Sequence, residues 1–123
     1  MPQRVKVHTY ATPYTPNLFY MSANNQTLEG LTLSLVGGAA ELNVGSGLIG
    51  VLAGGTSIEH KILTLDQGWF GSSHDLFWTG NLHLPDDCYL FGYVITDAAR
   101  DIRLSALLWD FEPPKLREKP GVA

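Results

Sequence analysis

The sequence predicts an all-β protein, a single antiparallel β-sandwich of about eight strands, and three observations support this prediction. Thirteen glycines and seven prolines divide the 123 residues into short segments, and these two residue types are the strongest turn signals. Several segments alternate apolar with polar side chains, which is the period of a strand with one buried face. Helical periodicity is scarce, and the turns recur at the spacing typical of a sandwich or barrel.

Two segments near the N-terminus show the alternation clearly. Residues 4–10 alternate Val5 and Val7 with a lysine and a histidine. Residues 31–38 alternate leucines with a threonine and a serine, and end in paired glycines. Both segments predict half-buried strands.

The middle of the chain predicts a hairpin followed by another strand. Residues 40–47 and 48–56 are short apolar pieces separated by Gly-Ser-Gly. Because glycine readily takes positive φ angles, this spacing places the hairpin turn at 45–47. Residues 57–68 alternate again, with a turn expected at 66–68.

Three more strands are expected at 74–84, 87–96 and 101–111. The second of them is apolar on both faces from residue 88 onward, which suits a central strand covered on one side by the opposite sheet. Its other side then needs a second cover, and a neighbouring subunit is one candidate.

Segment 98–109 allows two interpretations. Possible N-caps precede an apolar stripe at helical spacing, formed by Ala99, Ile102, Ala106 and Trp109. The same segment also alternates at the period of a strand. The strand is favoured, because a lone final helix would have to pack against a sheet already complete.

The two ends differ from the middle. Residues 1–16 form an N-terminal strand or arm region, residues 17–111 the sandwich core, and residues 112–123 an extended C-terminal tail. Proline fixes φ and removes a backbone donor, which favours extended chain at both ends. The candidate assembly arms are marked by Pro13, Pro16, Pro113, Pro114 and Pro120.

Charge and cysteine content exclude several functions. Eight Lys and Arg residues, a net charge of -4 and a pI near 5.4 argue against nucleic-acid binding, which requires clustered positive charge. Cys88 is the one cysteine, so it forms no internal disulfide and is expected to be a small buried side chain. No signal peptide or membrane-spanning segment is expected. The expected location is cytoplasmic, or a virion if the protein is viral.

Catalytic and metal motifs are not recognisable. His60, His74 and His83 fall on different segments without the short spacing of metal ligands. The aspartates at 66, 75, 86 and 87 border turns, where such side chains bond the local backbone. The sequence therefore predicts no catalytic residue, cofactor or metal.

The aromatic residues of the middle are the remaining candidates. As a set they either stack on a sugar ring or fill the core and a subunit contact, and the second interpretation is favoured because two of them lie in the strand that is apolar on both faces. The candidate interface or ligand-stacking residues are Trp69, Phe70, Trp78, Tyr89, Phe91 and Tyr93, with Phe77 beside them.

Residues 80–110 have a distinctive order: an apolar pair, Leu84-Pro85, a short acidic turn, a long apolar strand, a hairpin loop and a last alternating strand. This run resembles the closing strands of jelly-roll and related β-sandwich subunits of virus and bacteriophage particles. The resemblance implies a jelly-roll-like fold with extended terminal arms. It also implies a trimer or other ring that contacts further virion proteins.

The sequence therefore predicts a non-enzymatic, self-assembling structural protein, most concretely a capsid or decoration subunit of a virion. Its surface is rich in apolar residues and poor in charge, and its ends suit bridging between neighbours. One alternative is a carbohydrate- or small-ligand-binding module that stacks its ligand on Trp69, Trp78 and Tyr89. Another is a small jelly-roll enzyme with a histidine-bound metal.

Overall fold

The computed structural model describes residues 3–12, 17–36, 45–69, 74–96 and 100–110. Within these ranges the chain forms eight strands and one short 3-10 helix, η1 (Ile58–His60). No helix there is long and apolar enough to cross a membrane. The strands are β1 (Gln3–Thr12), β2 (Asn17–Ser22), β3 (Gln26–Val36), β4 (Gly45–Ala53), β5 (Lys61–Trp69), β6 (Leu76–Leu84), β7 (Cys88–Thr96) and β8 (Arg100–Asp110).

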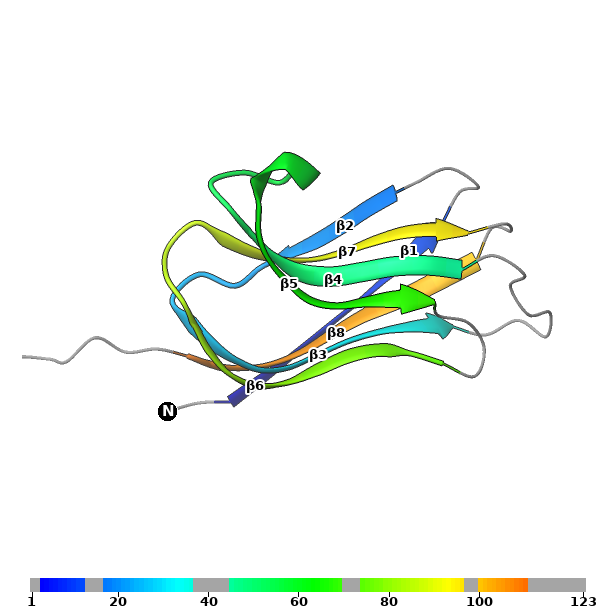
Figure 1. The fold of residues 1–123 in the computed structure, drawn as a ribbon. Coiled ribbons are helices and arrows are strands. Elements are labelled where there is room, and N and C mark those ends of the chain that lie inside the picture. Colours follow the sequence, from blue (N-terminus) through cyan, green and yellow to red (C-terminus); the bar gives the residue numbers. More distant parts are fainter. Residues whose placement is uncertain (1–2, 13–16, 37–44, 70–73, 97–99, 111–123) are drawn as a thin grey trace, which may run out of the picture.

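Two four-stranded sheets stack face to face (Figure 1). Sheet A has the strand order β1-β8-β3-β6 and sheet B the order β2-β7-β4-β5, and every neighbouring pair is antiparallel. The pairs β1–β8, β2–β7, β3–β6 and β4–β5 nest inside one another, as in one long hairpin folded over into two layers. This is the arrangement of an eight-stranded jelly roll, so the predicted all-β, jelly-roll-like sandwich is confirmed.

The core between the sheets is built largely from leucine and isoleucine on the inward faces of the strands. Its fully buried large members are Leu28, Leu31, Leu33, Ile49, Leu76, Leu90, Ile102, Leu104 and Leu108. Burying each such side chain contributes about 1.5–3 kcal/mol. Gly92 in β7 leaves room for the opposite sheet, since a Cβ there would lie 3.2 Å from Cδ1 of Leu33.

Two predicted turns are wrong. β4 runs unbroken through residues 45–47, where Gly47 is buried opposite Gly68 and Val94. Glycine at this place permits close strand packing instead of a turn. Residues 66–68 likewise lie inside β5, where Gly68 has a φ of 142° that other residues rarely adopt.

The strand count of eight is confirmed, although the strands are not all the predicted ones. β2 is an additional strand, because six residues next to a proline-rich stretch give little alternation to detect. The predicted hairpin supplies one strand where two were expected, and its residues 40–44 lie outside the described part of the chain.

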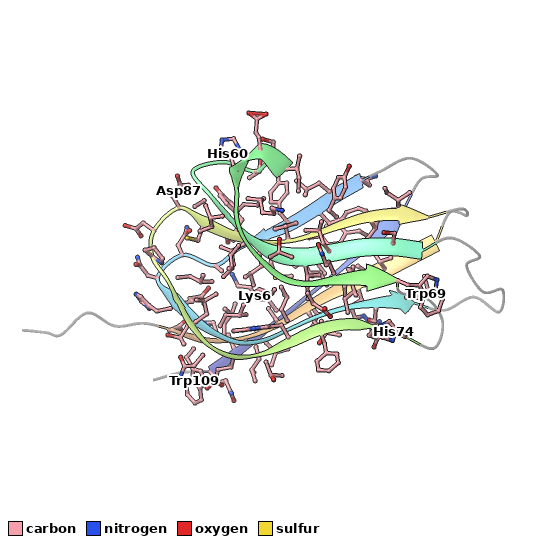
Figure 2. The ribbon with its side chains drawn as sticks, viewed as in Figure 1. Lys6, His60, Trp69, His74, Asp87 and Trp109 are labelled. Atoms are coloured by element: carbon pink, nitrogen blue, oxygen red, sulfur yellow. The ribbon has the colours of Figure 1, made fainter. Side chains whose placement is uncertain are left out.

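The favoured strand interpretation of the last segment is confirmed. β8 pairs with β1 on one side and with β3 on the other, in the interior of sheet A. The apolar stripe at helical spacing is divided between the two faces of this strand. Ile102 and Ala106 are buried in the core, whereas Trp109 lies on the outer side (Figure 2).

The turns at one end of the sandwich are joined by asparagine side chains. Asp86 and Asp87 form the β6–β7 turn, as predicted, and Asp87 has a φ of 62°. Asn25 donates to Asp86 through its amide at 2.5 Å, and the backbone N–H of Cys88 donates to Asn24 Oδ1 at 2.9 Å. Cys88 itself is buried, as expected, and burial raises the pKa of its thiol.

Candidate functional site

The structure places the predicted aromatic residues in three different locations. Trp78 points inward from β6 and packs, half-buried, against the core. Trp69 lies at the end of β5 with 46% of its surface exposed. Phe70 lies outside the described residues. The remaining three alternate along the outer side of β7: Tyr89, Phe91 and Tyr93.

The proposed stacking set of Trp69, Trp78 and Tyr89 therefore does not form one platform. Trp78 faces the interior from sheet A, and the other two belong to different strands of sheet B. The five prolines that mark the candidate assembly arms lie in residues 13–16 and 111–123, which are outside the described part of the chain.

His60, His74 and Asp66 have partners within the chain. His60 Nδ1 lies 2.8 Å from Ser57 Oγ next to η1, and the His74 ring lies 5.7 Å from that of Trp69 (Figure 2). Asp66 accepts the backbone N–H of Phe77 at 3.0 Å, which ties β5 to β6. Among the described residues, no group of three His, Cys, Asp or Glu side chains is placed to hold a metal ion.

β1 is inverted relative to an ordinary sandwich strand. Its even-numbered residues from Arg4 to Tyr10 pair with the residues of β8 that point into the core. Its valines therefore point outward, with Val5 69% and Val7 48% exposed. A strand that keeps charged side chains on the inner side and valines in solvent reverses the usual pattern.

The inward polar residues of β1 are used to close one open side of the sandwich. β1 and β2 are the edge strands there. Lys6 Nζ donates to the carbonyl of Ser22 at 2.7 Å, and the Tyr10 hydroxyl donates to the carbonyl of Tyr20 at 2.8 Å. Burial lowers the pKa of Lys6 and raises that of Tyr10.

A second polar link lies at the other end of the β1–β8 pair. Asp110 accepts from Gln26 Nε2 at 2.9 Å and from Arg4 Nε at 2.6 Å. These hydrogen bonds, first that of Gln26 and then that of Arg4, lower the pKa of the Asp110 carboxyl. The polar side of β1 thus has a structural explanation within the chain, whereas its valine side has none among the residues that the structure describes.

The valine side belongs to a larger surface, which we call the sheet A face. It consists of the outward residues of three adjacent cross-strand rows. Each row takes one residue from β1, β8, β3 and β6, in that order. The first row is Gln3, Trp109, Thr27 and His83, the second is Val5, Leu107, Gly30 and Thr79, and the third is Val7, Ser105, Thr32 and Phe77. No Lys, Arg, Asp or Glu occurs in these rows, and Glu29 lies beside them in the β3 bulge.

The sheet A face has exposed apolar side chains at its two edges and a depression at its centre. Phe77 is 61% exposed on β6, at the edge opposite the valines. Trp109 projects from the same side of the sheet (Figure 2). Between the edges lies a shallow depression of about 160 Å³ lined by Val5, Gly30, Thr32, Ser105, Ala106 and Leu107.

The outer side of sheet B is different, because the chain covers part of it. Leu90 and Val94 belong to the core, so Phe91 between them points away from it, yet Phe91 is completely buried. Its ring lies against Gly50, where a Cβ would come within 3.0 Å of Phe91 Cε1. The β4–β5 connection with η1 stands on this outer side (Figure 1).

Farther along the same side is an open groove, which we call the sheet B groove. It has a volume of about 430 Å³ and lies where β7, β4 and β5 run side by side. It is lined by Ser46, Gly47, Leu48, Gln67, Gly68, Tyr93 and Ile95.

No protein-family model, curated protein or solved structure matches this chain.

Sequence reasoning identified Phe77 and Tyr93 among the aromatics but missed the sheet A face, because alternation in 4–10 does not say which side of the strand points inward. The available signal is that all even positions from Arg4 to Tyr10 carry polar or charged groups long enough to bridge two sheets.

Proposed function

We propose that this protein is a non-enzymatic structural subunit that associates with copies of itself through the sheet A face. The single observation that carries the proposal is the inversion of β1, which exposes Val5 and Val7 while its charged residues point inward. Within the described part of the chain, no other residue covers these two valines. Burying them against a partner stabilises a complex by removing apolar surface from water.

A second copy is the partner that best fits the surface. When two identical faces meet about a two-fold axis, a charge near the axis approaches its own copy, and the three rows of the sheet A face carry no Lys, Arg, Asp or Glu. Raised edges around a small-residue centre also allow side chains of one copy to enter the depression of the other.

The resemblance to virus and bacteriophage subunits gives the proposed setting, a capsid or decoration protein of a virion. A two-fold pairing of the sheet A face makes a dimer the building block. The trimer or ring implied by the resemblance would need a further contact. Light scattering coupled to size-exclusion chromatography separates these assemblies by mass.

The proposal is tested by placing a charge on the face. Val5→Glu and Phe77→Glu should each weaken association by about tenfold or more, because each places a carboxylate in the interface, where it would lose its hydration without a counter-charge. Ile62→Glu is the matched control, since Ile62 on β5 is 62% exposed, as Phe77 is 61% exposed, but lies on sheet B.

Sedimentation velocity over the micromolar range provides the measurement. A wild-type chain that stays monomeric at every concentration, without other virion proteins to bind, would refute the proposal. An Ile62→Glu variant as defective as Phe77→Glu would also count against the sheet A face.

A further inference from the structure

The sheet B groove is on the opposite outer surface of the sandwich from the sheet A face. Its volume of about 430 Å³ falls within the range of small-molecule sites, roughly 300–1,000 Å³. An assembly formed through the sheet A face would leave this groove open to solvent. Ligand binding in this groove therefore does not depend on the proposed function.

Two glycines lie in the lining of the groove. Gly47 and Gly68 face each other across β4 and β5, and Gly47 also faces the core residue Val94 of β7. Nothing lies within 4 Å of a Cβ built at Gly68, so this position opens into free space. Tyr93 lies opposite Leu48, and Leu48 lies opposite Gln67, in one row across the groove.

The lining combines three kinds of group. Tyr93 supplies a half-buried aromatic ring, Leu48 and Ile95 supply apolar walls, and Gln67 and Ser46 supply an exposed amide and hydroxyl. An aromatic ring offers a flat apolar face with a polar edge. The amide and hydroxyl both donate and accept hydrogen bonds.

Among the described residues, the lining of the groove contains no charged side chain. Asp66, next to Gln67 in β5, is turned to the backbone of β6, where it accepts the N–H of Phe77. A phosphate, a carboxylate or an ammonium ion would lose its hydration in the groove without gaining a counter-charge. The ligand that fits is neutral, with hydroxyl groups around an apolar face.

We propose that the sheet B groove binds a neutral saccharide, with a pyranose ring stacked on Tyr93 and its hydroxyls bonded to Gln67 and Ser46. A pyranose presents C–H groups on one face and hydroxyls at its rim, which matches the lining. The open side of the groove admits the next sugar of a chain. In an assembled particle, repeated copies of the groove would bind a polysaccharide with avidity.

The test is titration with methyl hexopyranosides and neutral trisaccharides, followed by isothermal titration calorimetry and ligand-observed NMR. Tyr93→Ala should weaken binding by roughly tenfold, and Tyr93→Phe should retain most of it because stacking remains. Gln67→Ala is a second, exposed variant whose folding is not at risk. Tyr20→Ala is the matched control, since Tyr20 is 45% exposed on the same sheet but outside the groove.

Charged sugars and a short peptide serve as comparison ligands in the same titration. A hexuronate and a hexose phosphate should bind more weakly than the neutral sugars, and a short neutral peptide should not compete. The inference is overturned if no neutral saccharide binds at millimolar concentration, if charged sugars or the peptide bind better, or if Tyr93→Ala and Gln67→Ala both bind like wild type. Repeating the titration with Val5→Glu separates the two proposals, because saccharide binding should persist when association is lost.

Discussion

The two sheets differ in whether the chain covers particular apolar residues on their outer sides. Sheet B carries Phe91 and Leu52 on its outer side and buries both completely within the same chain. Sheet A carries Val5 and Phe77 on its outer side and leaves both more than half exposed. The two surfaces contain similar residue types, so composition does not distinguish them.

The difference shows what apolar residues do on the outside of a sandwich. On sheet B, Phe91 and Leu52 form a second small packing layer that stabilises the monomer, whereas Tyr20, Ile62 and Trp69 of the same sheet stay exposed. On sheet A, Val5 and Phe77 have no covering partner within the described residues, which is typical of a surface that binds another molecule. Substitution of Phe91 on sheet B should therefore affect stability, whereas substitution of Phe77 on sheet A should affect association.

The largest difference is expected between two phenylalanines. Phe91→Ala should destabilise the monomer by about 3–5 kcal/mol, because it leaves a cavity in a fully buried site. Phe77→Ala should change the monomer by less than about 1 kcal/mol, because its side chain is 61% exposed. Urea denaturation at low protein concentration measures both. A large effect of Phe77→Ala at low concentration would show that the residue already packs within one chain.

A glycine pair gives a comparison of intermediate size. In Gly50→Ala the new Cβ would lie 2.0 Å from the carbonyl oxygen of Leu63, a backbone atom, so the strands must shift. We expect a loss of about 2–3 kcal/mol. In Gly30→Ala the nearest atoms are 3.8 Å away, and stability should stay within about 0.5 kcal/mol while association changes as the depression fills. Equal destabilisation of the two variants in thermal unfolding would contradict this comparison.

The smallest effect is expected at the polar link that holds β1 in sheet A. Hydrogen bonds from Gln26 and Arg4 lower the pKa of Asp110. A lowered carboxyl pKa contributes stability that is fully present above the unfolded value, near about pH 4, and is lost as pH falls through the folded value. Asp110→Asn should therefore be slightly less stable than wild type at neutral pH.

The pH dependence is the diagnostic part of that prediction. The difference in melting temperature between Asp110→Asn and wild type should shrink as pH decreases below about 4. Arg4→Met, which removes one donor, should show an intermediate dependence. A difference that is constant with pH would mean that the Asp110 charge does not contribute.

Much of the fold could be predicted from local pattern. Alternating leucines at 31–35 predicted a half-buried strand, which is β3 of the structure, and the doubly apolar segment from residue 88 predicted a central strand, which is β7. Prediction was wrong at 45–47 and 66–68, where glycines lie inside strands. A glycine permits both a turn and a close approach of two strands, and its local sequence does not distinguish them.

The candidate sites were harder to predict for a related reason. Phe77 and Trp78 are adjacent aromatics on one strand, yet one is exposed on the sheet A face and the other packs against the core. The sheet B groove joins residues from three strands, of which only Tyr93 was recognised as a candidate. Such sites depend on strand register, which long-range pairing sets.

The sequence by itself determined that this protein is an all-β sandwich with about eight strands, because the period of two and the turn residues are local properties of the chain. The tertiary structure decided which side of each strand points inward. In β1 that choice placed Lys6 and Tyr10 across the open side and the valines in solvent. The physical reason is that an edge strand can satisfy its long polar side chains on the backbone of the other sheet, and only the folded arrangement brings that backbone within reach.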